Sequence, residues 1–348
     1  MKALALGRDG LTPARLVGRI AAHDVRGMGG KIIVRKGQLL DAATAALALE
    51  APWSTPLHVL ELEPGDIHEE PAGSRLAQAA AGPGVQVKGY GGGQWTLAAA
   101  RRGLVRVRDR ALREVNTESG IAVFTLWDLQ PVDADEVVAK AKVTPLAIAE
   151  SVIKHVESLA WAAGGLLTVQ GFESRLIGAI SRESLEPRQR ERFESALQEK
   201  MDWFGSRLLP VRYSGGDAAA VAATIEGVIG EGADLVIVAG ASALDPLDPV
   251  FLGIEAAGGH MERHGVPAHP GSLLFLADIG GRPVLGMPTC GMFSQATTFD
   301  LVLPRLLTGE PVGNLELAGL GEGGLMSGES AWRFPPYRKN AARGELGE

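Results

Sequence analysis

The chain has 348 residues, of which 46% are hydrophobic and 22% charged, and its formal net charge is −7. This composition supports buried cores and argues against a mainly disordered chain. The single Cys excludes a disulfide framework and a Cys-only zinc cluster, while the net negative charge and only 5% aromatic residues argue against binding to nucleic acid.

The first 150 residues form short elements separated by Gly and Pro, which predicts a small α+β region. The expected strands cover 16–22, 31–34, 57–62, 104–107, 121–126 and 143–146, and the expected helices cover 42–50, 69–81 and 109–116. Asp41 is the predicted N-cap of the first helix. Residues 151–162 are expected to form a linker helix.

From about residue 163 strands alternate with helices, which is typical of an α/β domain. We expect strands at 166–170, 208–213 and 235–239, a hairpin of 273–278 and 282–285, and helices at 188–204, 217–230 and 294–307. Asp217 is the predicted N-cap of its helix, and the continuous apolar run 235–239 is typical of a parallel strand buried on both faces. The pattern predicts an α/β fold: a three-layer α/β/α domain with a mostly parallel sheet over 163–312, then a partly ordered extension over 313–348.

Three loops rich in small residues follow expected strands, at 171–174, 240–248 and 286–291. In open α/β sheets ligands bind outside the carboxyl ends of the strands, so these loops are expected to meet at one edge. Small residues let backbone N–H groups approach an anion. Glu173, Asp245 and Asp248 are the candidate catalytic residues, because carboxylates handle Mg²⁺ or an oxyanion, and Asp245 and Asp248 are the candidate metal ligands.

Four segments resemble, in order and approximate spacing, the motifs TGDE, TGGxSxGxxD, KPGKP and GLPGNP. They are 170–173, 240–248, 269–272 and 286–290. These motifs belong to the molybdopterin-binding domain of molybdenum-cofactor biosynthesis proteins, the family of the MoeA and gephyrin E molybdenumtransferases. Front segments at 21–24, 35–37, 63–69 and 143–145 resemble a divergent bacterial branch, so the resemblance covers roughly 15–312.

The resemblance implies a molybdopterin-binding protein that inserts molybdate into molybdopterin or its adenylylated form, with Mg²⁺, or alternatively a non-catalytic carrier or sensor. It also implies a homodimer, with other cofactor-biosynthesis proteins or molybdoenzymes as further partners. No apolar run approaches a membrane span, and we expect a soluble cytoplasmic protein. The implied cofactor-binding residues are Gly171, Gly240, Ala241, Ser242, Pro270, Gly271, Ser272, Gly286, Pro288, Thr289, Cys290 and Gly291.

The chain departs from these motifs at several positions. Val238 and Ala239 replace the Thr and first Gly of TGG, His269 and Ser272 replace the two Lys of KPGKP, and Cys290 stands at the motif Asn. Because these groups bind phosphate, metal and molybdate in the family, the departures favour binding over catalysis.

Other interpretations of the singled-out residues stay open from sequence alone. Asp245 or Asp248 would also serve as a turn or N-cap residue, and Glu173 as a charge in a first helical turn. Cys290 is either a small buried hydrophobe or an exposed thiol. His260, His264 and His269 suggest zinc, but 265–267 (Gly-Val-Pro) breaks the helix that would align the last two. The basic stretch 101–113 is either a solvated face or an anion site.

Overall fold

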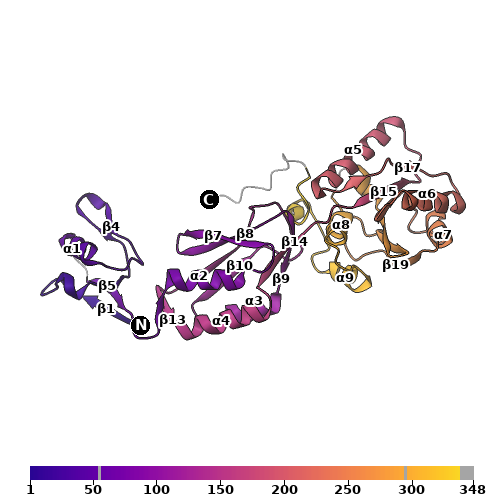
Figure 1. Ribbon diagram of the computed structural model, residues 1–348. Helices are drawn as coiled ribbons and strands as arrows, with labels where there is room; N and C mark the ends of the chain where they lie inside the picture. Colours follow the sequence, from indigo (N-terminus) through magenta and orange to yellow (C-terminus); the bar gives the residue numbers. More distant parts are fainter. Residues whose placement is uncertain (54–55, 294–295, 338–348) are drawn as a thin grey trace. The chain divides into compact units, whose positions relative to one another are not determined.

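The computed structural model describes residues 1–53, 56–293 and 296–337 (Figure 1). The chain forms two compact units: unit 1 comprises 1–100, 106–127 and 134–169, and unit 2 comprises 101–105, 128–133 and the chain from 170 onward. Helices and several separate sheets are present, so the expectation of a mixed α/β protein is confirmed.

Unit 1 begins with a small antiparallel sheet beside one helix. The sheet order is β1 (Lys2–Leu6), β5 (Leu57–Glu61), β2 (Ile20–Ala21), accompanied by the ribbon β3 (Val25–Arg26) and β4 (Ile32–Val34) and by α1 (Ala42–Glu50). Asp41 caps α1 as predicted, because its Oδ1 accepts a hydrogen bond from Thr44 N at 2.8 Å. The strand expected at 16–22 is wrong except at β2: a 3-10 helix, Pro13–Arg15, precedes it, and Gly18 turns the chain with φ +81°.

The rest of unit 1 is a four-stranded antiparallel sheet with helices. The strand order is β10 (Ile121–Thr125), β12 (Val137–Val143), β8 (Gln94–Ala99), β7 (Val85–Gly91), and the helices are α2 (Glu69–Ala80), α3 (Asp109–Asn116) and α4 (Glu150–Ala162). The helix expected at 151–162 is therefore present. Arg75 of α2 joins it through Glu150 at 2.9 Å and Glu157 at 2.5 Å.

The strand expected at 143–146 is wrong. Val143 ends β12, and residues 144–146 separate it from β13 (Ala147–Ala149), which pairs with β6 (Asp66–His68). Pro145 lies in the separating bend and has no N–H to offer a ladder, which explains the interruption.

Unit 2 is built on a larger sheet. Its strands lie in the order β16 (Arg207–Leu208), β15 (Leu176–Ser181), β18 (Leu235–Ala239), β21 (Arg282–Met287), β20 (Phe275–Ile279), β19 (His260–His264), and β17 (Arg212–Tyr213) also pairs with β15. Parallel pairing extends from β16 to β21, whereas β20 and β19 are antiparallel. The predicted hairpin is confirmed as β20–β21, turning at Gly280-Gly281.

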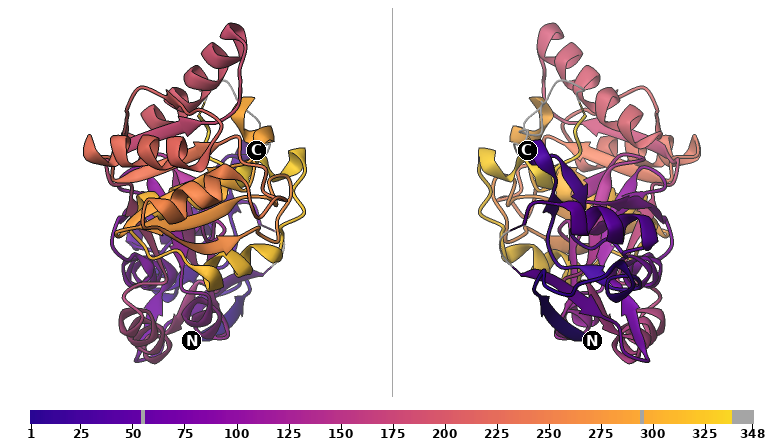
Figure 2. Two further views of the ribbon diagram at one scale, coloured as in Figure 1. Left: turned by 90° about the vertical axis from the view of Figure 1, so that its right-hand side faces the viewer. Right: turned by 90° about the vertical axis from the view of Figure 1, so that its left-hand side faces the viewer.

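Alternate residues of β18 enter two different hydrophobic clusters. Leu235, Ile237 and Ala239 pack with residues of α5 (Pro187–Phe204) and α8 (Phe299–Leu307). Val236 and Val238 pack with residues of α6 (Ala218–Gly230) and α7 (Pro249–Ala256). Every residue of β18 is buried, as its apolar run predicts, and Figure 2 shows the helices of unit 2 packed around its strands.

Two strand predictions in this region are corrected. The segment expected as the first strand of the large sheet is β14 (Leu167–Gly171), which is not part of that sheet, and the strand there is β15. A glycine such as Gly178 usually argues against a strand, but it lies inside β15. A Cβ there would lie 2.9 Å from the side chain of Val228. The glycine therefore permits close approach of α6. The strand expected at 208–213 is split into β16 and β17 around Pro210, which cannot donate to a ladder.

The described residues that follow α8, as far as 337, pack more closely than expected. The helix expected at 294–307 begins at Phe299, and 294–295 lie outside the described residues. Beyond it, α9 (Asn314–Ala318) and the following segment contribute Leu317, Leu320, Met326 and Phe334 to the same cluster as α5 and α8. Within the described part of the chain, no helix is both long and apolar enough to cross a membrane.

The cap of α6 leads to a modest stability prediction. Asp217 Oδ1 accepts a hydrogen bond from Ala220 N at 2.8 Å, which confirms the predicted N-cap. Asp217→Ala is expected to lower the free energy of unfolding by about 1 kcal/mol, since an N–H of the first turn loses its partner. Urea denaturation measures this. Asp217→Asn, which keeps the acceptor, should retain most of the stability, and an equal loss in both variants would contradict the capping role.

Candidate functional site

A pocket of about 230 Å³ lies at the carboxyl ends of β18 and β21. It brings together many residues that the motifs single out: Ala241, Gly271, Ser272, Gly286, Pro288, Thr289 and Cys290. The other lining residues are Ala243, His269, Leu273, Phe275 and Met287. Segments separated by up to about fifty positions in the sequence thus form one concave site, and this is the candidate functional site.

Two glycines shape the pocket wall by allowing other groups to pack closely. A Cβ on Gly286 would lie 2.2 Å from the ring of Phe275, the residue that begins β20. Gly271 has φ +101°, and a Cβ there would lie 2.5 Å from Thr298 Oγ1. The space freed by these two glycines is filled by Phe275 and Thr298, so both glycines serve the packing of the pocket wall.

The loop from His269 to Ser272 is held from two sides. Thr298 donates from its N to Pro270 O at 3.0 Å and from its Oγ1 to Gly271 O at 2.5 Å. On the other side His269 N donates to Gly324 O at 2.7 Å, and Met326 N donates to His269 O at 2.9 Å. The start of α8 and the C-terminal segment therefore both position this wall.

Asp248 is committed to organising the loop after β18. It is 1% exposed, and its Oδ1 accepts a hydrogen bond from Val250 N at 2.8 Å, which makes it the N-cap of α7. Its Oδ2 accepts from Ser242 N at 2.9 Å and from Arg182 Nη2 at 2.9 Å. Asp245 is exposed and its Oδ1 accepts from Leu247 N at 2.9 Å, a turn contact. Of the roles left open by the sequence, Asp248 therefore has that of an N-cap and Asp245 that of a turn residue.

Sequence reasoning missed Arg182 and Glu183 because it missed β15. Both follow the carboxyl end of that strand, and Glu183 lies against Gly240 and accepts from Thr289 Oγ1 at 3.5 Å. The apolar residues of 176–180 are the available signal for the strand, and Gly178 interrupts them. These two residues add a positive and a negative charge to the edge where the pocket lies.

Gly171 and Glu173 are not brought to this edge. They lie before the first residue of β15, whereas the pocket lies at the carboxyl ends of β18 and β21. The length of β15, roughly 20 Å, therefore separates them from the pocket. Glu173 pairs with Arg175 at 2.5 Å, and its N donates to Leu307 O at 2.7 Å. Gly171 lies close to Arg101.

The residues present do not fit the expected Mg²⁺ centre. In the described residues no group of three or more His, Cys, Asp or Glu side chains is placed to hold a metal. Asp248 directs its carboxylate at two N–H groups and at the Arg182 cation, which would repel a divalent ion. Among the described residues His260, His264 and His269 likewise form no group placed to hold zinc, and His260 contacts Glu262.

Cys290 is exposed and lines the pocket, so it is not the small buried hydrophobe considered from sequence. Gly291 follows it, with N donating to Pro288 O at 2.8 Å. The pocket therefore offers a thiol, two hydroxyls and an imidazole among apolar side chains: Cys290, Ser272, Thr289 and His269.

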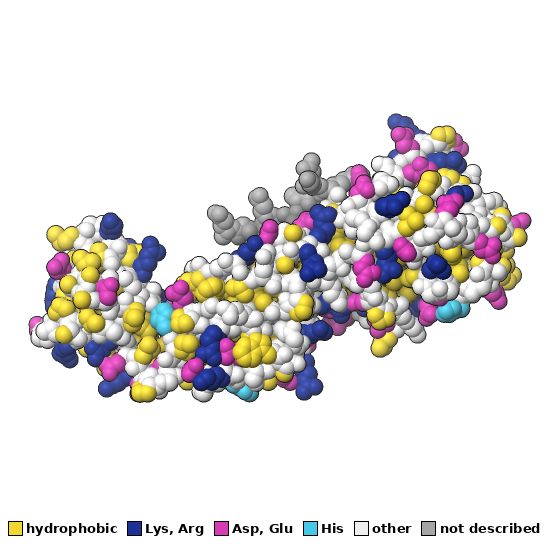
Figure 3. All heavy atoms as spheres, in the orientation of Figure 1, with side chains coloured by type: hydrophobic (Ala, Val, Ile, Leu, Met, Phe, Trp, Pro, Cys, Tyr) yellow, Lys and Arg dark blue, Asp and Glu magenta, His cyan; other side chains and the backbone are white. Residues whose placement is uncertain are grey.

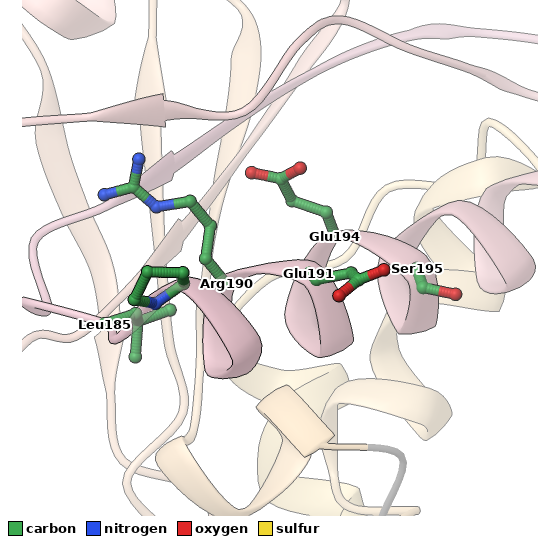
Figure 4. Close-up of a pocket in the computed structure, with 6 residues that line it drawn as sticks. Leu185, Arg190, Glu191, Glu194 and Ser195 are labelled. Carbon is green, nitrogen blue, oxygen red and sulfur yellow. The ribbon is translucent and has the colours of Figure 1, made fainter.

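A second hollow lies at the start of α5, and Figure 4 shows Arg190, Glu191, Glu194 and Ser195 on the helix and Leu185 just before it. It is lined by Leu185, Pro187, Arg190, Glu191, Glu194 and Ser195. The Arg190 guanidinium lies 3.8 Å from the ring centroid of Tyr213, whose hydroxyl donates to Glu194 at 2.9 Å. Burial raises the pKa of Tyr213, so the hydroxyl stays protonated and donating. The charged residues here stabilise the packing of Tyr213.

The basic stretch 101–113 contains side chains engaged with neighbours. Arg110 pairs with Glu114 at 3.0 Å and Arg113 with Asp109 at 2.8 Å, both one turn apart on α3. On the face shown in Figure 3, Lys and Arg are interspersed with Asp and Glu. These contacts agree with the interpretation of α3 as a solvated face.

Comparisons with known proteins give little to add. No family model and no curated protein matches the sequence. Among solved structures, the chain is similar to the molybdopterin biosynthesis MoeA protein from Pyrococcus horikosii, at 14% identity over 88% of this chain and 74% of that one, with a TM-score of 0.30. A NadC deletion mutant matches at 10% identity over 46% of this chain and 75% of that one, with a TM-score of 0.16. Both similarities are too distant to indicate a function.

Proposed function

We propose that unit 2 is a three-layer α/β/α molybdopterin-binding domain and that the chain acts in molybdenum-cofactor biosynthesis. The observation that carries the proposal is the pocket at the ends of β18 and β21, which gathers the residues chosen from three separate motif segments. The alternate burial of β18 between two helix-bearing clusters supports the layered arrangement.

The lining suits a small ligand with a flat ring and polar substituents. Phe275, Met287 and Leu273 provide apolar surface, and Ser272 and Thr289 provide hydroxyl groups. A few polar groups in a mostly apolar concavity are typical of small-molecule sites. The substrate or cargo would be a pterin carrying an anionic group, held by these side chains and by His269.

Binding as a carrier or sensor is better supported than molybdate insertion. Asp248 is engaged in hydrogen bonds within the loop, and Glu173 lies at the other end of β15. Neither of these two candidate catalytic carboxylates lines the pocket. A carrier should retain molybdopterin without turning over molybdate. Incubating the pterin-loaded protein with molybdate and measuring molybdenum by mass spectrometry tests this, and molybdenum incorporation beyond a protein-free control would favour the transferase.

Blocking the pocket is the direct test of binding. Cys290→Trp places a large ring in the lining at an exposed position, so the fold should tolerate it while the pocket of about 230 Å³ closes. We expect protein from a molybdopterin-producing host, purified anaerobically, to carry pterin, and the variant to carry at least about tenfold less. Pterin is measured by fluorescence after iodine oxidation.

The matched control is Glu255→Trp, an exposed position on α7 away from the lining. It should keep the wild-type pterin content, and thermal unfolding should show both variants folded. Equal pterin in the wild type and Cys290→Trp, or none in the wild type, would overturn the proposed function. The homodimer implied by the resemblance stays a prediction, which sedimentation equilibrium would check.

A further inference from the structure

The loop that follows β18 is fixed by a charge pair from two neighbouring strands. Arg182 comes directly after β15 and Asp248 ends the loop after β18, and β15 and β18 pair through Ser181 and Ala239 at their last positions. The Nη2–Oδ2 distance is 2.9 Å, with the Asp248 side chain 2% exposed and that of Arg182 25% exposed. The pair therefore joins the loops that follow two neighbouring strands, at a partly buried site.

The same carboxylate closes the loop on itself. One oxygen accepts from Ser242 N at the beginning of the loop and the other from Val250 N at the start of α7. Each oxygen thus faces N–H donors, which are the opposite of what a hard cation requires. Mg²⁺ needs oxygen ligands at about 2.0–2.1 Å in near-octahedral geometry.

A guanidinium and a divalent cation compete for one carboxylate. Two positive centres held by the same group repel each other strongly at a partly buried site, where solvent screening is weak. The neighbouring Asp245 directs Oδ1 at Leu247 N in an exposed turn, and Glu183 lies against Gly240. Among the residues that the structure describes, no third ligand completes a metal site.

We infer that Arg182 takes the place of a divalent metal at this loop. It is a positioning residue: its charge neutralises Asp248 and holds the 240–248 loop in place, and the chain uses no Mg²⁺ there. Removing that charge should leave the buried Asp248 carboxylate held only by the Ser242 and Val250 N–H groups, which should loosen the loop. This inference does not depend on which ligand occupies the pocket.

The experiment titrates the full-length protein with Mn²⁺ alone, following the free-ion signal by electron paramagnetic resonance. Wild type should show no stoichiometric binding below about 1 mM, and Arg182→Lys should behave likewise because it keeps the positive charge. Arg182→Gln should also show no stoichiometric binding, because the Asp248 oxygens keep their two N–H donors and the described residues offer no further ligands.

Loop order supplies a second readout. Limited proteolysis should cut within 240–248 faster in Arg182→Gln than in wild type or Arg182→Lys, with or without Mn²⁺. Mn²⁺ bound by wild type and lost in Asp248→Asn would overturn the inference, and that comparison stands even if Arg182→Gln fails to fold. A folded Arg182→Gln whose loop is cut no faster than that of wild type would overturn it as well. None of these results changes the pterin measurement, so the two proposals fail separately.

Discussion

Asp300→Ala is expected to lower the free energy of unfolding by about 3–5 kcal/mol, because it leaves a buried ammonium group without its counter-charge. Asp300 is 0% exposed and Lys200 3% exposed, and Lys200 Nζ contacts Asp300 Oδ1. The other carboxylate oxygen accepts from Thr297 N at 2.9 Å. Removing the carboxylate therefore breaks an ion pair between α5 and α8 and a cap at the start of α8.

The C-terminal segment takes part in the same network. The Tyr337 hydroxyl donates to Asp300 Oδ1 at 2.8 Å, and Lys200 Nζ lies 4.2 Å from the Tyr337 ring centroid. Burial first, and the negative charge of Asp300 second, raise the pKa of Tyr337, so the hydroxyl remains a donor. Loss of Asp300 should consequently also loosen the segment that holds His269 in the pocket wall.

Urea denaturation of the purified chain measures the effect. Lys200→Met with Asp300→Leu should recover part of the loss, since apolar residues can replace a buried ion pair, while Thr297 N and the Tyr337 hydroxyl stay without their acceptor. Glu114→Ala, which breaks an exposed pair on α3, is the matched control and should change stability by no more than about 0.5 kcal/mol. A loss in Asp300→Ala no larger than that of the control would contradict the argument.

Gly286→Ala is expected to cost about 1–3 kcal/mol or more, although it adds a single methyl group. The new Cβ would lie 2.2 Å from Phe275 Cδ1, and the ring is itself held edge-on by Phe251 at a centroid distance of 5.2 Å. The ring is buried and has little room to move. Since Gly286 and Phe275 both line the pocket, the pocket should also lose pterin.

The cause is tested by a double-mutant cycle. Phe275→Ala alone should cost about 3–5 kcal/mol, but Gly286→Ala should then be nearly neutral, because the clash has been removed. Gly227→Ala is the matched control: no atom lies within 4 Å of its added Cβ, and in the middle of α6 it should stabilise by up to about 1 kcal/mol. Additive losses at Gly286 and Phe275 would show that the ring is not the obstacle.

Much of the local structure followed from the sequence because its causes are local. Asp41 and Asp217 correctly predicted where two helices begin, because an N-cap needs only a side-chain oxygen and the N–H group three residues later. The apolar run of β18 and the glycine pair of the β20–β21 turn were sufficient for the same reason. Two of the three loops expected to meet, those after β18 and β21, do so, because parallel strands present their carboxyl ends at one edge, whereas the loop 171–174 does not.

Only the tertiary structure decided the features that depend on partners distant in sequence. The sequence did not predict β15, because Gly178 interrupts it and the reason for that glycine is the close packing of α6. The position of β15 in turn determines where Arg182 and Glu173 lie. The chemistry of Asp248 likewise follows from an arginine 66 positions away, which no local pattern indicates. A carboxylate beside small residues has the same sequence whether it binds a metal or a guanidinium, because its charge is satisfied through space and only the fold selects the partner.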